Sequence, residues 1–73
     1  MSIVLELFVI CVAAVGASPM CFAVKEKETR FFESMEACHV HYADSANALE
    51  AAVAKDGLVT HQVVIKCAER EAI

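Results

Sequence analysis

Glycine and proline are scarce in this sequence, which has two glycines, Gly16 and Gly57, and one proline, Pro19, among 73 residues. A glycine-rich loop of the kind that cradles a phosphate group is therefore absent from the sequence. The sequence also contains no internal repeat and no low-complexity segment. A chain of this length holds one small domain at most.

Basic residues are missing from the first 24 positions, and all six lysines and arginines follow them. Ten acidic residues give the chain a formal net charge of −4. The one basic cluster, "KEKETR" at 25–30, is largely neutralised by its own glutamates. Nucleic-acid binding requires a clustered basic face, so we expect no nucleic-acid partner.

The first 24 residues contain one charged side chain, Glu6, and favour an apolar leader that is separate from the rest of the chain. In the first interpretation, residues 1–17 are a signal peptide and residues 18–73 form the domain. The apolar core of this leader is Leu7–Val15, and small residues at Val15–Ala17 suit a cleavage site. Signal peptides normally begin with basic residues, and this sequence has none there.

Two other interpretations of the leader remain open. A membrane anchor over 3–24 is long enough to span a bilayer. Lys25 and Lys27 follow it directly and, by the positive-inside bias, would hold the domain in the cytoplasm. Alternatively, residues 3–12 form a buried β-strand of a cytosolic protein, because a short apolar run alone does not distinguish these structures.

The sequence predicts an α+β fold, in which the apolar leader or helix precedes a small strand–helix–strand domain with one central amphipathic helix. We predict strands over 20–24 and 58–68 and a helix over 34–56. Within the helix, apolar residues recur at steps of three and four, without glycine or proline. Ser34 suits the N-cap, and Gly57 suits the left-handed residue that follows a helix.

The predicted strands are parallel if they pair directly with each other, through a right-handed crossover. A two-stranded sheet with one helix is marginally stable, so we expect a third strand from the leader or from a partner chain. Alternate residues of the second strand are expected to face the helix. These residues are Val59, His61, Val63, Ile65 and Cys67.

Cys38, His39 and His41 lie within four positions, in the sequence "CHVH". Successive helix residues are about 100° apart, so the two histidines point to nearly opposite faces and do not bind one ion together. A weaker candidate metal site combines Cys38, His41 and Cys67, although a structural zinc site requires four ligands. We therefore interpret His39, His41 and His61 as partly exposed residues, and we expect no metal and no other cofactor.

The cysteines predict one disulfide, because a core this small supplies only about 3–5 kcal/mol without a covalent link. Cys38 near the helix start and Cys67 near the end of the last strand lie at the same end of the domain, and we predict that they pair. If the strands are antiparallel, Cys21–Cys67 is the alternative pair. With Cys38–Cys67 formed, Cys21 is left over as a candidate contact with another chain, and Cys11 belongs to the leader.

Catalysis is not indicated by the sequence. Covalent catalysis needs a nucleophile with a base within reach, and Cys38 beside His41 or His39 is the only candidate pair. No third residue orients the pair and no pocket is indicated, so we expect that the protein is not an enzyme.

The stretch from Cys21 through "RFFESMEAC" to "VVIKC" resembles small exported proteins that are common in alphaproteobacteria. The shared pattern is a leader, a cysteine that opens a strand, a Phe-x-Ser-x-x-x-Cys helix start, an alanine-rich helix and a strand that ends in cysteine. Phe32, Ser34 and Cys38 form the helix start here. The resemblance covers about residues 21–67 and implies export, because the family has no assigned activity.

The sequence thus predicts a small exported or membrane-tethered protein, periplasmic or secreted, that acts by binding another protein. One alternative is a single-pass accessory subunit of a membrane complex that contacts the membrane through 3–24. A second alternative is a redox module that binds thiols or metal.

Overall fold

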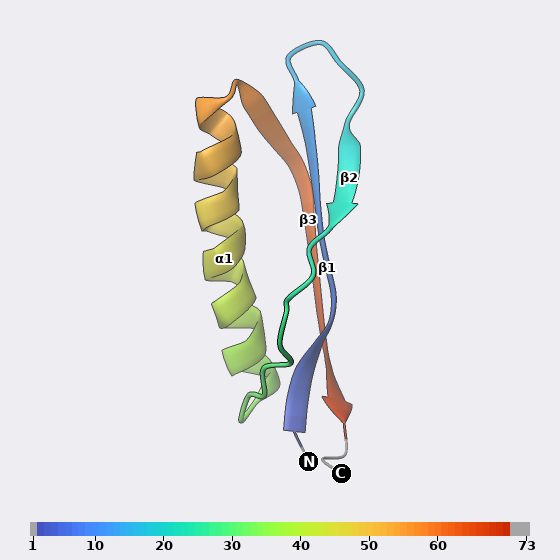
Figure 1. Ribbon diagram of the computed structural model, residues 1–73, viewed down its shortest axis with the longest axis vertical. Coiled ribbons are helices and arrows are strands. Elements are labelled where there is room, and N and C mark those ends of the chain that lie inside the picture. Colours follow the sequence, from blue (N-terminus) through green and yellow to red (C-terminus); the bar gives the residue numbers. More distant parts are fainter. Residues whose placement is uncertain (1, 71–73) are drawn as a thin grey trace.

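The computed structural model describes residues 2–70 and has two layers, a three-stranded sheet and one helix (Figure 1). The sheet order is β2-β1-β3, so β1 is central, and both neighbours run antiparallel to it. Helix α1 lies along one face, chiefly over β3. The predicted α+β class is confirmed. The elements are β1 (Ser2–Ala14), β2 (Met20–Ala23), α1 (Met35–Lys55) and β3 (Leu58–Arg70).

The N-terminal apolar run builds the central strand, so the structure does not support a separate leader over 1–17. Seven of the thirteen residues of β1 are buried. β1 has neighbours at both edges, and residues at consecutive positions 10–13 are buried, so side chains of both its faces are shielded, which suits a nearly continuous apolar sequence. Of the three interpretations of this run, the structure contains the third, a strand over 3–12, extended to Ser2–Ala14.

The interpretation of 3–24 as one membrane-spanning helix is wrong. This stretch contains β1, a turn and β2. The turn begins with a hydrogen bond in which the Ala17 N–H donates to the Ala14 carbonyl at 3.0 Å, and Gly16 supplies a φ of 82° that L side chains rarely adopt. Within residues 2–70, no helix combines the length and the apolarity needed to cross a membrane.

Two irregularities in the pairing of β1 with β3 decide which side chains face the helix. The register skips Glu6 on β1 and His61 on β3, as in a β-bulge. The prediction that alternation continues from Val59 to Cys67 is therefore wrong at the start of β3. Val63 packs in the core with Cys67, whereas Val59 and His61 are exposed.

Helix α1 begins and ends where the sequence predicts. The Ala37 N–H donates to the Ser34 side-chain oxygen at 3.0 Å, which satisfies one of the unpaired N–H groups of the first turn. At the other end Gly57 has a φ of 80°, and its N–H donates to the Ala54 carbonyl at 3.1 Å. The chain then turns directly into β3.

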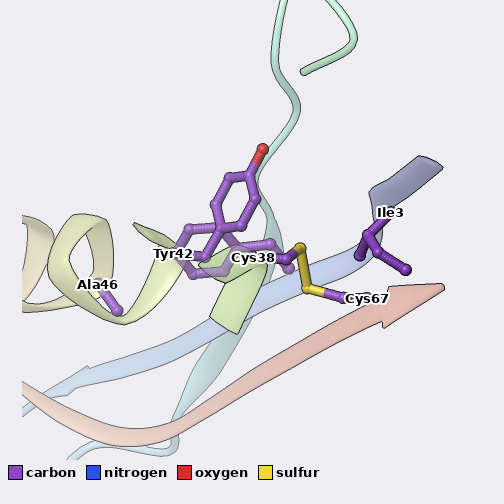
Figure 2. Packing of buried hydrophobic residues seen from close by; sticks show 6 residues of the cluster. Ile3, Cys38, Tyr42, Ala46 and Cys67 are labelled. Carbon is purple, nitrogen blue, oxygen red and sulfur yellow. A yellow bond between two sulfur atoms is a disulfide. The ribbon is translucent and has the colours of Figure 1, made fainter. Parts of the chain in front are cut away.

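The core lies between α1 and the adjacent halves of β1 and β3 (Figure 2). Cys38, Tyr42 and Ala46 are four residues apart on α1, so they form one stripe facing the sheet. Met35, three residues before Cys38, is exposed and is not part of this stripe. The buried members of the core are Ile3, Phe8, Cys38, Tyr42, Ala46 and Cys67.

Candidate functional site

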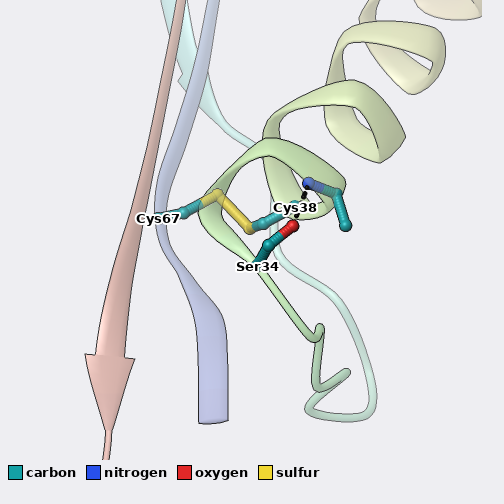
Figure 3. Close-up of a disulfide and its surroundings, with 4 residues drawn as sticks. Ser34, Cys38 and Cys67 are labelled. Atoms are coloured by element: carbon teal, nitrogen blue, oxygen red, sulfur yellow. Dashed lines mark hydrogen bonds between the residues drawn. A yellow bond between two sulfur atoms is a disulfide. The ribbon is translucent and has the colours of Figure 1, made fainter.

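One disulfide joins the helix to the sheet. Cys38 and Cys67 are bonded across 29 residues, with their Cα atoms 6.3 Å apart (Figure 3). Cys38 lies at the end of the first turn of α1, where its N–H donates to the Ser34 carbonyl at 3.2 Å, and it is fully buried. This is the pair that the sequence reasoning predicted, and the alternative Cys21–Cys67 is not formed.

A second disulfide, which the sequence reasoning did not predict, joins β1 to β2. Cys11 and Cys21 are partners in the antiparallel register, with their Cα atoms 3.9 Å apart. The assignment of Cys21 as a leftover thiol for another chain is therefore wrong, and so is the assignment of Cys11 to a leader. The error followed from treating residues 1–17 as separate. Two apolar runs that flank a short segment with Gly16 and Pro19 are a hairpin signal that would have placed the two cysteines opposite each other.

The two disulfides indicate an oxidising environment, because disulfides persist outside the cytosol and are reduced within it. All four cysteines form disulfides, so the protein has no free thiol. The candidate metal set of Cys38, His41 and Cys67 lacks thiolates in this state, because its two sulfur atoms are bonded to each other. Among residues 2–70, no group of three or more His, Cys, Asp or Glu side chains is placed to hold a metal ion.

The three histidines lie apart from one another. His39 and His61 are exposed, the first on the outside of α1 and the second at the irregularity of β3. His41 is half-buried, and its ring lies 5.3 Å from that of Phe32 and 4.9 Å from that of Tyr42, measured between ring centres. His41 therefore packs in an aromatic cluster, and the predicted divergence of His39 and His41 on the helix agrees with this placement.

Tyr42 is the most buried polar side chain of this cluster, with an exposure of 2%. Its ring packs edge-on against Phe8 and Phe32, at centre distances of 5.8 and 5.7 Å. Burial is the main cause that raises the pKa of Tyr42 to about 12, and a hydrogen bond to the Glu26 carboxylate and its negative charge contribute to the same increase. The neutral Tyr42 hydroxyl on α1 thus contacts Glu26 in the segment that follows β2.

A hollow lies beside Tyr42, where residues 24–30 pass over β1. Its volume is about 340 Å³. The walls combine apolar residues of β1 with the charged side chains of 25–30, and Tyr42 closes one side. Lysines, glutamates and an arginine alternate in this wall, so it presents no charge of one sign to a ligand.

Helix α1 is the one element of residues 2–70 that packs on the sheet, and it lies on one face (Figure 1), so the opposite face is not covered by a further element. Because Phe8 and Ile65 pack toward the helix, their neighbours Val9 and Val64 point the other way. The same alternation places the Cys11–Cys21 disulfide on this side. We call this surface the open face. Its apolar and disulfide-bonded members include Leu7, Val9, Cys11, Ala13, Cys21, Ala23, Val59 and Val64, and the polar side chains of Gln62 and Lys66 lie on the same side.

Comparison with known proteins identifies no relative, since no protein-family model, no curated protein and no solved structure matches the chain.

Proposed function

We propose that the protein is exported and acts in an oxidising compartment outside the cytoplasm, as a non-catalytic binding protein whose partner is another protein. The observation that carries this proposal is the open face. Leu7 and Val59 on it are 37% and 48% exposed, and Val9 and Val64 between them are half-buried. An apolar surface of this kind on a small protein is typical of a protein interaction site.

The charges at one end of the open face indicate the chemistry of the partner. Lys66 and Arg70 project from β3 on this side, since their register partners Leu7 and Ser2 point away from the helix. Both side chains are basic and exposed, although the chain as a whole carries a net charge of −4. The complementary partner is an apolar protein surface with acidic residues at one end, because such pairing steers and orients association.

The experiment compares two exposed valines on opposite sides of the molecule. A photo-crosslinking amino acid replaces Val59 on the open face or Val40 on the outer side of α1, which is 54% exposed. Both variants are produced in the native cells and irradiated. We expect position 59, and not position 40, to yield one discrete adduct with another protein.

A further substitution tests whether the adduct reports binding through the open face. Leu7→Glu places a charge on this face, and we expect at least a tenfold loss of the adduct at unchanged protein level. The proposal is contradicted if position 59 gives no adduct, if position 40 gives the same adduct as position 59, or if the adduct survives Leu7→Glu.

A further inference from the structure

The two disulfides lie in different surroundings. Cys38 is 0% exposed and Cys67 is 8% exposed, and their bond lies in the core between α1 and β3. Cys11 is also buried, at 5%, but its partner Cys21 is exposed, on the short edge strand β2. A thiolate must reach a sulfur atom to exchange with it, so access differs between the two bonds.

The surroundings of Cys21 also make local opening easy. All four residues of β2 are exposed, and so are the flanking residues 14–19. β2 pairs with β1 over four residues only, from Val9–Ala23 to Val12–Met20. An edge strand with little burial opens at a small fraction of the global unfolding free energy. Besides this short ladder and the hydrogen bond from the Val24 N–H to the Phe8 carbonyl at 2.8 Å, the Cys11–Cys21 bond is the covalent link between β2 and β1.

We propose that the Cys11–Cys21 disulfide is a thiol–disulfide exchange site for a dithiol reductant, and that its reduction releases β2 from the edge of β1. The inference does not depend on the proposed protein partner, because it concerns the chemistry of this bond. The Cys38–Cys67 disulfide remains intact in the same reaction and keeps α1 on β3.

The exchange proceeds in two steps that balance. A thiolate of the dithiol attacks the sulfur of Cys21, the exposed residue of the pair, so a mixed disulfide forms, the Cys11–Cys21 bond breaks and Cys11 leaves as a thiolate. The second thiol of the reductant then attacks the mixed disulfide and releases Cys21. The reductant becomes a disulfide, and Cys11 and Cys21 take up its two electrons and two protons.

Release of β2 changes the sheet from three strands to two over part of its length. The backbone of Val9–Val12 loses its partners in β2 and stays paired with β3. This side of β1 therefore becomes an edge of the sheet. An unpaired edge of apolar residues is a template for the addition of another strand. Reduction of this bond thus exposes a strand edge that the oxidised protein covers.

The experiment follows reduction of the folded full-length protein by dithiothreitol at neutral pH. Aliquots are alkylated at intervals, digested and mapped by mass spectrometry. We expect Cys11 and Cys21 to be labelled at least ten times faster than Cys38 and Cys67. In concentrated urea, where access is equal, the preference is expected to disappear. Equal labelling of all four cysteines in the folded protein, or faster labelling of Cys38 and Cys67, overturns the proposal.

Hydrogen exchange on the selectively reduced protein tests the release of β2. Amides of 20–23 and 9–12 are expected to exchange faster after reduction, whereas those of α1 keep their protection. The variant Cys11→Ala/Cys21→Ala provides the control, since it should show the exchange pattern of the reduced protein without any reductant. Unchanged protection of 9–12 and 20–23 in both samples overturns the release of β2.

Discussion

At the scale of single residues, Tyr42 shows how burial and hydrogen bonding reinforce each other. The only tyrosine of the chain packs among Phe8, Phe32 and His41 and donates a hydrogen bond to Glu26. The helical spacing from Cys38 predicts that Tyr42 faces the core. Its contact with Glu26 was not predictable, because 25–30 has no regular pattern that fixes its path.

The titration of Tyr42 is the first prediction. Its pKa is about 12 in the folded protein, against the ordinary value of 10.0. Because the sequence has one tyrosine and no tryptophan, the ultraviolet absorbance of tyrosinate reports this group alone. We expect a midpoint near 12 in the folded protein and near 10 in urea. A folded midpoint near 10 would show that the hydroxyl is hydrated.

The same shift predicts how stability depends on pH. The folded state holds the Tyr42 proton more tightly than the unfolded state, so its contribution is complete below pH 10. That contribution is lost as the pH rises toward 12, with a total of up to about 2–3 kcal/mol. Urea unfolding of the wild type should weaken over this interval, whereas Tyr42→Phe should show a smaller decrease.

The cap of α1 is also tested by a single residue. Ser34→Ala removes the acceptor for the Ala37 N–H and is expected to lower the free energy of unfolding by about 1 kcal/mol. Ser18→Ala, in the exposed turn between β1 and β2, is the matched control and should change stability little. Equal effects of the two substitutions in urea unfolding would argue against the cap.

At the scale of elements, the helix was predictable and the role of the first strand was not. Ser34 and Gly57 are local signals, and they set the ends of α1 to within one residue of the predicted 34–56. The apolar run 3–12 has the composition of a leader and of a central strand alike. Only pairing with β2 and β3 distinguishes the two, and pairing depends on residues far away in the sequence.

The two disulfides are expected to differ in their contribution to stability. Cys38–Cys67 closes a loop of 29 residues and Cys11–Cys21 one of 10. Chain-entropy arithmetic gives about 3–4 kcal/mol for the first and about 2–3 kcal/mol for the second. Cys38→Ala/Cys67→Ala also leaves a cavity in the core, whereas Cys11→Ala/Cys21→Ala opens an edge.

Thermal unfolding followed by circular dichroism measures this difference. The Cys38→Ala/Cys67→Ala variant should have the lower melting temperature of the two, and the Cys11→Ala/Cys21→Ala variant should keep the helical signal of the wild type at room temperature. The reverse order of melting temperatures would mean that β2, and not the contact between α1 and β3, limits stability.

At the scale of the whole molecule, the fold depends on β1. This strand contacts both other strands, contributes Ile3 and Phe8 to the core, and carries one cysteine of a disulfide. β2 and β3 each pair with β1 and not with each other. Without β1 the sheet is therefore lost, and α1 covers β3 alone. Because two strands and one helix are marginal, the sequence predicts a third strand from the leader or from a partner chain, and the N-terminal run supplies it.

Truncation tests this dependence. A chain that begins at Ser18 lacks the central strand and leaves Cys21 without its partner. We expect it to show no cooperative unfolding transition, because its remaining apolar surface is not buried. A cooperative transition of the truncated chain with the stability of the full-length protein would show that β1 is dispensable.

The mass of the intact protein isolated from its native cells tests the central claim most directly. If β1 is part of the functional fold, the mass retains the residues of Ser2–Ala14. It is also four hydrogen atoms lower than that of the fully reduced chain, two for each disulfide. A mass that lacks residues 1–17, or one that retains four thiols, would contradict this account.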